Sequence, residues 1–402
     1  MAEPWLTIIG LGEDGLDGLS SASRDAISAA DVVAGSSRHL QLLSGVGATT
    51  FEWPVPFADG VEQVLAMRGQ SVVVLASGDP FWFGAGAVFA ARLPAGEWRA
   101  IPGPSAFSWA AARLGWRLEE TTCLGLHAAG YPRLRPHLAP GARLLVTLRD
   151  GAAVRRLADY LRVAGFGETS IWIMEALGGP RERVRLVAAN EVHDLEVAAP
   201  VLAGLLVAGP GPALPVASGR ADQLFEHDGQ ITKSPIRAMT LAALAPVAGE
   251  LLWDIGAGSG SISIEWLLAH PAMRAIAIEA NQERAERAQR NAQAFGVDRL
   301  DVRLDVRLGT APGALLGLSL PDAVFIGGGV DHSLLDWLWA TIKPQTRVVA
   351  NAVTLEAEAL LAQWQQKAGG SLLRIDIAEA LPLGSKRGWR SSLPIVQWRT
   401  VR

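Results

Sequence analysis

The sequence predicts an α/β protein of two domains, each with strands that end in glycine-rich loops. Its 402 residues are 50% hydrophobic and 19% charged, which is enough apolar material for two or three domains with their own cores. Short apolar, β-branched runs that end in glycine alternate with helical patterns, as in βα units. The segment 211–228 is rich in Pro and Gly and has no apolar period, which is typical of a linker.

The two halves differ in charge. Residues 1–228 hold 18 basic and 24 acidic side chains, a net charge of −6, whereas residues 229–402 hold 18 and 16, a net charge of +2. All the lysines lie in the second half. We therefore expect one domain at 1–210, a linker at 211–228 and a second domain at 229–402.

The composition disfavours several classes of protein. A net charge of −4 argues against a groove of high positive potential, so no nucleic-acid partner is expected. The single cysteine, Cys123, cannot form an intramolecular disulfide or a thiolate zinc site, and no metal site is expected. Prolines interrupt the most apolar stretch, 197–217, so no membrane contact is expected either. The N-terminus does not follow a signal-peptide pattern, and we expect a soluble cytoplasmic protein.

The first strand is expected at residues 5–10, WLTIIG, and a loop with the spacing GxGxxG follows it. The glycines of this spacing are Gly10, Gly12 and Gly15. Dinucleotide-binding folds use such a loop to hold a pyrophosphate at a helix N-terminus. Here three carboxylates would repel that group, and they belong to Glu13, Asp14 and Asp17. The residues therefore disfavour a nicotinamide site, which stays open as an alternative.

Later strands of the first half also end in turns with polar side chains. The apolar run that begins at Val72 ends in Ser77, Gly78 and Asp79, and the carboxyl end of such a strand is where open α/β sheets bind ligands. A further short strand precedes Ser105, which is placed to cap the next helix. Two more strands are expected at 144–151 and from residue 170 to Glu175.

In this order the motifs resemble the tetrapyrrole (corrin/porphyrin) methylase family over about the first 210 residues. They read GLGEDGLDGLS, SGDPFWFG, IPGPSAFSWAAARLGW and EALGGPRERV. The resemblance implies a class III methyltransferase fold, in which two α/β lobes enclose S-adenosylmethionine. It implies a cofactor site lined by Ser77, Gly78, Asp79, Ser105 and Met174. It also implies that the loop of Gly10, Gly12 and Gly15 lies toward a tetrapyrrole.

The second half begins its core with an apolar strand that ends at Asp254. A GxGxG loop follows it, made of Gly256, Ala257, Gly258, Ser259 and Gly260. The next strand ends at Glu279, where a carboxylate can accept both ribose hydroxyls of a nucleoside while the glycines let the backbone approach the ligand. This arrangement looks like a seven-stranded, Rossmann-like class I methyltransferase that uses S-adenosylmethionine. A later strand ends at Thr310 and Ala311, where this family places the adenine, but a tandem repeat in Leu300–Leu308 leaves its register open.

The ends of the second half resemble the decarboxylating precorrin methyltransferase family of cobalamin synthesis. The matching patterns are ITK-x-x-IR near residue 231 and the closing W-x-x-x-LPI strand. The resemblance implies that Thr232 contacts the cofactor and that Lys233 and Arg237 pair with substrate carboxylates. A solvated helix start is an equally acceptable interpretation of Lys233 and Arg237.

The two halves in this order resemble the fused methyltransferases of the aerobic cobalamin pathway. The resemblance implies methylation of a precorrin at C5 by the first half, and methylation at C15 with loss of the C12 acetate carboxyl by the second. It implies two S-adenosylmethionine sites, a polycarboxylate tetrapyrrole substrate and a homo-oligomer. No catalytic residue is assigned, because the reduced macrocycle can supply both the carbon nucleophile and the electron sink.

Other functions remain open at this stage. They are methylation of another tetrapyrrole, methylation of RNA by the second fold, a nicotinamide-dependent oxidoreductase and a non-catalytic scaffold. Methylation of RNA would need a basic surface, for which a net charge of +2 is thin support.

Overall fold

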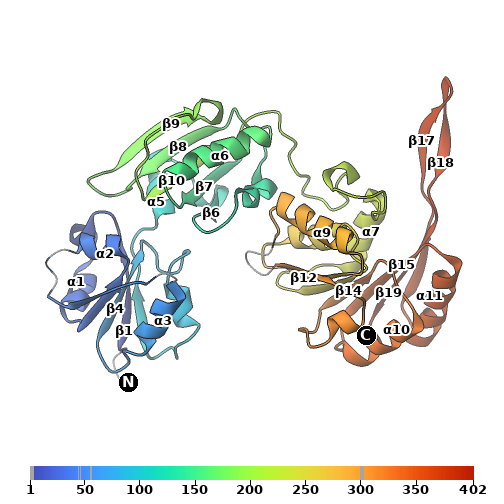
Figure 1. Ribbon diagram of the computed structural model, residues 1–402, viewed down its shortest axis with the longest axis horizontal. Helices are drawn as coiled ribbons and strands as arrows, with labels where there is room; N and C mark the ends of the chain where they lie inside the picture. The colour runs from blue at the N-terminus through green and yellow to red at the C-terminus, as the bar shows by residue number, and fades with distance from the viewer. Residues whose placement is uncertain (1–3, 44, 46, 55–56, 299–302) are drawn as a thin grey trace. The chain divides into compact units, whose positions relative to one another are not determined.

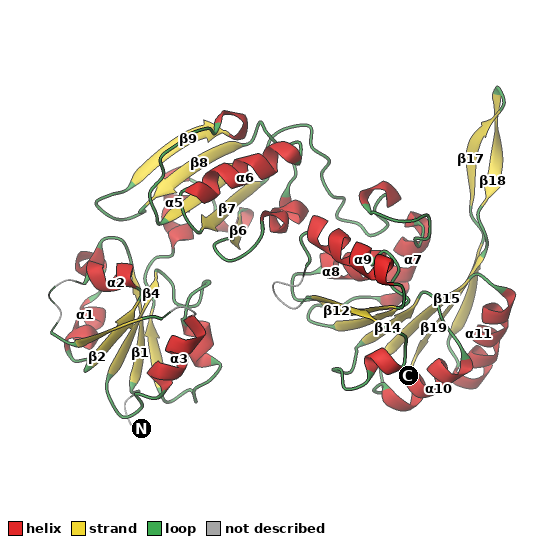
Figure 2. Ribbon diagram, in the orientation of Figure 1, coloured by secondary structure: helices red, strands yellow, loops and turns green. Residues whose placement is uncertain are grey.

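The computed structural model describes residues 4–43, 45, 47–54, 57–298 and 303–402. Contacts divide the chain into two units, Met1–Ala129 with His137–Ala213, and Gly130–Pro136 with Leu214–Arg402. Both units are α/β, as expected (Figure 1, Figure 2). Among the described residues, no helix has the length and apolar character that crossing a bilayer requires.

The first unit begins with a parallel five-stranded sheet, in the order β3-β2-β4-β1-β5. Its strands are β1 (Leu6–Leu11), β2 (Val32–Gly35), β3 (Thr49–Glu52), β4 (Val72–Ser77) and β5 (Trp98–Ile101). Every residue of β1 is buried, as expected of a central parallel strand covered on both faces. One core lies under α1 (Ser21–Ser28), and the other lies under α3 (Phe57–Leu65) and α4 (Gly86–Ala90). We call this sheet and its helices the first lobe.

The second lobe of this unit is a mixed sheet in the order β6-β7-β10-β8-β9. Its strands are β6 (Thr122–Gly125), β7 (Arg143–Leu148), β8 (Ser170–Glu175), β9 (Arg183–Ala188) and β10 (Val201–Leu206). Only β6 and β7 pair in parallel. The helices are α5 (Ala106–Leu114), which begins at the Ser105 cap as predicted, and α6 (Ala152–Val163).

The second unit contains a seven-stranded sheet in the order β13-β12-β11-β14-β15-β19-β16. These strands are β11 (Leu251–Ile255), β12 (Arg274–Glu279), β13 (Leu304–Leu308), β14 (Ala323–Ile326), β15 (Arg347–Ala352), β16 (Ser371–Ile375) and β19 (Ile395–Val401). Strand β19 runs antiparallel to both of its neighbours. The strand order reverses at β11, because β12 follows on one side and β14 on the other. Such a reversal is where open α/β sheets bind ligands.

Helices among the described residues cover the two faces of this sheet. The core of one face includes α10 (His332–Thr341) and α11 (Leu355–Ala368). The core of the other includes α7 (Ser234–Leu244), α8 (Ser261–Ala269) and α9 (Gln282–Ala294). The central strands β11 and β14 are buried on both faces, so the loops at their carboxyl ends are where a ligand site is expected.

A separate hairpin, β17 (Ala378–Leu383) and β18 (Lys386–Ser391), projects from the second unit (Figure 2). It is two-stranded and pairs with no other named strand. Leu383 and Trp389 are 70% and 78% exposed. The sequence analysis did not anticipate this hairpin.

The segment predicted as a linker is largely part of the second unit. The contact boundary lies between Ala213 and Leu214, inside the predicted linker of 211–228. Phe225 is 4% exposed within the core of that unit. The backbone N–H groups of Gly219 and Arg220 donate to the Glu265 carboxylate at 2.6 and 2.9 Å. The expectation of a linker over 214–228 is therefore wrong, because that stretch has buried side chains and fixed hydrogen bonds.

Candidate active sites

In the first unit, three loops after parallel strands meet through glycine. The Gly78 N–H donates to the Leu11 carbonyl at 3.0 Å, and the Gly103 N–H donates to the Gly78 carbonyl at 3.1 Å. A Cβ at Gly10 would lie 1.8 Å from the Gly78 oxygen. Only glycine fits at position 10, because any side chain there would push the loops after β1 and β4 apart.

Most of the predicted cofactor residues of this unit lie at that edge. Ser77 is the last residue of β4, and the Asp79 carboxylate accepts the Phe81 N–H at 2.8 Å. Ser105 is buried and caps α5 through the Ser108 N–H at 3.1 Å. A Cβ at Gly78 would be 2.9 Å from the Ser105 Cα, so these two loops are in contact. Met174, the other residue predicted to line the cofactor site, is 1% exposed and packs in the core of the second lobe.

The conformation of the acidic loop after β1 depends on its own glycines. The Asp14 carboxylate lies beside Gly12, where a Cβ would be 2.5 Å from Oδ1. Gly15 has a φ of +59° and lies against the Leu42 carbonyl, 2.7 Å from where its Cβ would be. The loop therefore needs glycine for its own conformation, whichever ligand it faces.

Three further residues at this edge were not indicated by the sequence motifs. Arg38 and His39 are on α2 (Ser37–Leu42), after β2, and Arg181 is on the turn between β8 and β9. Arg38 Nη2 donates to the Ser77 Oγ at 2.7 Å, and His39 Nε2 is 2.9 Å from the same oxygen. Burial and the neighbouring Arg38 charge lower the pKa of His39 to about 3, so its ring is neutral at pH 7. The available signal was the SSRHL sequence directly after the VVAG strand.

In the second unit, the GxGxG loop is fixed to the neighbouring strand. The N–H groups of Gly256 and Ala257 both donate to the Ile278 carbonyl, at 2.9 and 3.0 Å. The Gly258 N–H donates to Glu279 Oε2 at 2.8 Å. A Cβ at Gly260 would be 3.0 Å from the Ala288 Cβ, so this last glycine lets α9 pack closely. The structure thus brings the predicted glycines and Glu279 together.

Asp254 and Ser259 complete this edge with unsatisfied polar atoms. Asp254 is 1% exposed, and its Oδ2 accepts the Ser263 N–H at 3.1 Å and the Ser263 hydroxyl at 2.6 Å. Within the described residues, Asp254 Oδ1 and the Ser259 hydroxyl are buried without a hydrogen-bond partner. Burial raises the pKa of Asp254 to about 6, against the lowering effect of the Ser263 hydrogen bonds, and the Glu279 charge adds to the rise.

The loop predicted at the adenine edge lies next to Glu279. The Gly309 N–H donates to the Glu279 carbonyl at 2.9 Å, and the Thr310 carbonyl accepts the Ala314 N–H at 2.9 Å. Thr310 and Ala311 therefore come directly after Gly309, whose backbone is hydrogen-bonded to the end of β12. The second copy of the tandem repeat forms β13, whereas residues 300–302 of the first copy lie outside the described residues.

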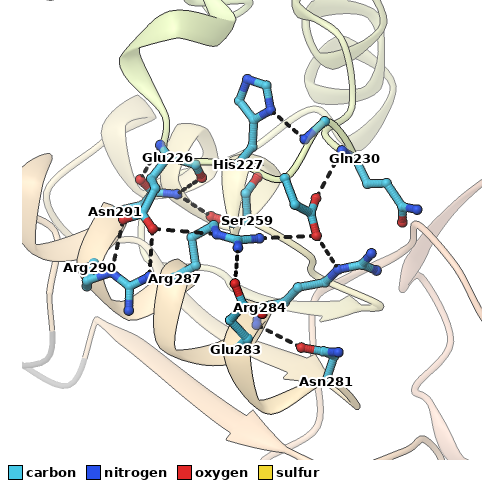
Figure 3. Close-up of polar contacts among 12 residues, drawn as sticks. Glu226, His227, Gln230, Ser259, Asn281, Glu283, Arg284, Arg287, Arg290 and Asn291 are labelled. Carbon is cyan, nitrogen blue, oxygen red and sulfur yellow. Dashed lines mark hydrogen bonds and ion pairs between the residues drawn. The ribbon is translucent and has the colours of Figure 1, made fainter.

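A segment before α7 is fixed to α9 beside the glycine loop, and we call residues 226–230 the strap (Figure 3). Asn291 donates from Nδ2 to the carbonyls of Glu226 and Ser259, both at 2.9 Å, and accepts the Glu226 N–H at 2.8 Å. The strap also carries Asp228, whose carboxylate pairs with Arg284 at 2.9 Å and Arg287 at 3.2 Å. One amide side chain therefore holds both the strap and the glycine loop.

Arg237 is not placed to bind a substrate, contrary to the expectation from sequence. Its side chain has no exposed surface, and Nε donates to the Glu265 carboxylate at 2.7 Å. Its other nitrogens donate to Asp222 and to the carbonyls of Thr232 and Arg220. The guanidinium is taken up by these contacts, so Arg237 holds the start of α7 in place.

Lys233 and Thr232 remain beside the start of α7. The Lys233 side chain is 51% exposed, and its Nζ is 3.7 Å from Asp222 Oδ2. Thr232 is half-buried and contributes its carbonyl to Arg237. The predicted roles of both residues stay predictions. Of the two, Lys233 has an accessible positive charge that can pair with a substrate carboxylate.

Two protein families match the chain. Tetrapyrrole (corrin/porphyrin) methylases match residues 5–192, and the precorrin methyltransferase domain matches residues 223–402. The chain is 48% identical, over 406 residues, to a precorrin-6Y C(5,15)-methyltransferase [decarboxylating] of a Sinorhizobium species, with 99% of this chain and 96% of that relative covered. The chain belongs to the family of decarboxylating precorrin-6Y C5,15-methyltransferases. The resemblances seen in the sequence are confirmed.

Two shorter relatives of this methyltransferase family come from Salmonella typhimurium. A cobalt-precorrin-7 C(5)-methyltransferase is 29% identical over 49% of this chain and 98% of its own length. A cobalt-precorrin-6B C(15)-methyltransferase (decarboxylating) is 34% identical over 34% of this chain and 69% of its own length. The name of the Sinorhizobium relative combines C5 and C15 methylation, whereas each Salmonella protein is named for one of the two.

Membership of this methyltransferase family implies S-adenosylmethionine as cofactor, and the second unit fits it. The unpartnered Asp254 Oδ1 and Ser259 hydroxyl are polar atoms that the amino-acid part of such a ligand can satisfy. A Cβ added to Gly258 would have one neighbour within 4 Å among the described residues, the Gln230 carbonyl oxygen at 3.9 Å. The loop therefore has room for a ligand at this position. Both Glu279 oxygens accept backbone N–H groups and retain lone pairs for hydroxyl donors.

Proposed function

We propose that the chain methylates a precorrin at C5 and C15 and removes the C12 acetate carboxyl as CO2, as a cytoplasmic enzyme with one S-adenosylmethionine site in each unit. The first unit carries C5 methylation, and the second carries C15 methylation with decarboxylation. The observation that carries this proposal is the presence of a separate glycine-lined strand edge in each unit, since two donor sites match two methyl transfers. The names of the relatives support the same division.

The residues of both edges act mainly by binding and orientation. When bound, S-adenosylmethionine supplies an already activated methyl group. In the second unit, Glu279 holds the nucleoside hydroxyls and the loop at Gly258 admits the rest of the ligand. In the first, Ser77 and Asp79 lie where the donor is expected. Such orientation contributes on the order of 7–11 kcal/mol to lowering the barrier.

The protein does not need a strong base of its own in this scheme. The reduced macrocycle supplies the carbon nucleophile and, once protonated, accepts the electrons released with CO2. Asp331 and His332, at a loop after β14, fit a structural role, because Asp331 caps α10 through the Leu334 N–H at 2.8 Å. No catalytic base is assigned.

We also propose that the chain self-associates through the β17–β18 hairpin. An isolated two-stranded hairpin is at best marginally stable in water, and this one exposes Leu383 and Trp389. Trp389 lies opposite Ala380 and Leu383 lies opposite Lys386, so the hairpin exposes an apolar side chain on each of its two faces. A second copy of the chain would cover these side chains.

Mass spectrometry of precorrin products tests the proposed reaction. Precorrin-6Y incubated with S-adenosylmethionine and the protein should gain two methyl groups and lose one CO2. Asp79→Ala should block one methylation, and Glu279→Ala should block the other together with decarboxylation. An unchanged mass would overturn the proposed substrate, and RNA would be the next acceptor tested. The same missing step in both variants would contradict the division between units.

A further inference from the structure

A buried carboxylate in the first unit is shared by two arginines from different lobes. Glu13, in the loop after β1, is 8% exposed. Arg38 Nη1 donates to its Oε1, and Arg181 Nη2 donates to its Oε2 at 3.2 Å. A Cβ at Gly179 would be 2.5 Å from the Glu13 Cβ, so the β8–β9 turn lies directly against this loop. The two guanidiniums are therefore fixed at the carboxyl edge of the parallel sheet.

The cluster of Glu13, Arg38 and Arg181 has a net positive charge. Two guanidiniums face one carboxylate, and the adjoining His39 ring is neutral. The side chains of Arg38 and Arg181 retain 34% and 61% exposure, whereas Glu13 retains 7%. The negative charge is thus buried and the positive charge is accessible, in a half of the chain whose net charge is −6.

This positive cluster adjoins the predicted donor site. Arg38 Nη2 is 2.7 Å from the hydroxyl of Ser77, which ends β4. Of the nearby carboxylates, that of Asp79 accepts the Phe81 N–H and that of Asp14 lies against its own loop beside Gly12 and Gly18, while Asp17 is exposed. Arg38 and Arg181 offer an anionic ligand at this edge two partly exposed guanidinium groups.

We propose that Arg38 and Arg181 bind peripheral carboxylates of the macrocyclic substrate at the first donor site, with Glu13 positioning both guanidiniums. The inference rests on the proposed function, since it takes a polycarboxylate tetrapyrrole as substrate. A planar guanidinium can hold a carboxylate through two parallel hydrogen bonds, which fixes orientation as well as affinity. The sequence made this loop look repulsive to an anion, but the charge of Glu13 is buried against the two arginines, whose guanidiniums stay accessible.

Porphyrin binding to the full-length chain tests this site without any methyl transfer. The probes are uroporphyrin and coproporphyrin, which has fewer carboxylates, titrated by absorbance. Arg181→Ala should weaken uroporphyrin binding about tenfold, as expected for a hydrogen-bonded charge pair, and should affect coproporphyrin less. Arg181→Lys should recover part of the loss, because it restores the charge but not the planar fork.

Two further variants separate this role from a structural one. Arg155→Ala is the matched control, because Arg155 has 63% side-chain exposure and pairs with Asp194 in the same unit. Glu13→Gln keeps the shape of the side chain but replaces one of its two acceptor oxygens with an amide NH2, so one guanidinium loses its anchor and uroporphyrin should bind more weakly to this variant. Equal binding by Arg181→Ala and Arg155→Ala, or tighter binding by a folded Glu13→Gln, would overturn the proposal. A failed methylation assay with these binding results intact would reject the proposed reaction and leave the carboxylate site standing.

Discussion

At the scale of single residues, Asp254 shows how burial changes the chemistry of a side chain. Its carboxylate is 1% exposed, and it receives hydrogen bonds only from Ser263 among the described residues. Burial raises its pKa from 3.8 to about 6, and the charge of Glu279 acts in the same direction. A carboxyl with a raised pKa stabilises the folded state at low pH, and this contribution is lost as the pH rises through about 6.

We predict that Asp254→Asn removes this pH dependence from the second unit. A shift from 3.8 to about 6 corresponds to a free energy on the order of 3 kcal/mol. The unfolding free energy of Asp254→Asn, minus that of the wild type, should therefore increase by that order between pH 4 and pH 7. Urea denaturation across this range measures the difference. The contributions of other titrating groups are the same in both proteins and cancel. A difference that stays constant with pH would show that Asp254 is ionised throughout.

At the scale of elements, α9 organises the second donor site through its contacts with the strap. Arg290 and Glu226 form an exposed pair at 2.6 Å, which adds little because solvent screens it (Figure 3). Asn291 is 3% exposed and makes three hydrogen bonds, to the strap and to the Ser259 carbonyl. Hydrogen bonds of a buried amide contribute more, because their loss leaves buried backbone groups unsatisfied.

We predict that Asn291→Ala destabilises the second unit by about 2–3 kcal/mol and weakens its S-adenosylmethionine binding. The physical reason is that the glycine loop loses its attachment at Ser259 while the strap is released at Glu226. Calorimetric titration and thermal unfolding of the full chain measure the two effects. Arg290→Ala, on the same helix, is the control and should change neither. Unaltered cofactor affinity in a destabilised Asn291→Ala protein would limit this residue to a structural role.

The β17–β18 hairpin leads to a second prediction at this scale. If it is an association surface, Trp389→Ser should shift the protein toward smaller species, since the indole is 78% exposed. Sedimentation velocity over a range of concentrations measures this. Val163→Ser is the control, because Val163 is 90% exposed at the end of α6 and lies in the first unit. The same sedimentation for wild type and Trp389→Ser would remove the hairpin from consideration.

At the scale of the whole molecule, the chain consists of two units with separate cores. The boundary between Ala213 and Leu214 assigns the segment with Arg220 and Phe225 to the second unit. The Phe225 ring is buried there, 4.7 Å from the Arg237 guanidinium. Each unit therefore has its own core, and a cut at this boundary removes only the short segment Gly130–Pro136 from the second unit.

We predict that a fragment of residues 214–402 folds and that a fragment of residues 229–402 is less stable by about 3–5 kcal/mol. The shorter fragment lacks the Phe225 ring and the two N–H groups that hold Glu265, so the buried Arg237 and Glu265 lose partners. Urea denaturation of both fragments, followed by tryptophan fluorescence, gives the comparison. Equal stabilities would mean that 214–228 acts as a linker after all.

Features that depend on local order along the chain could be predicted from the sequence. Apolar runs located β1, β4, β11 and β12, because central parallel strands are buried on both faces. Glycine spacing located the loops at Gly10 and Gly256, because close backbone approach excludes a Cβ. The family followed from the order of these motifs, and the comparisons confirm it.

The use of charged side chains could not be predicted from the sequence. Glu13 is paired with Arg181, 168 positions away, which buries one charge of the acidic loop against a partly exposed guanidinium. Arg237 is buried against Glu265, so a residue expected to meet substrate instead supports α7. Spacing along the chain cannot reveal such outcomes, because burial and ion pairing depend on which distant elements come into contact.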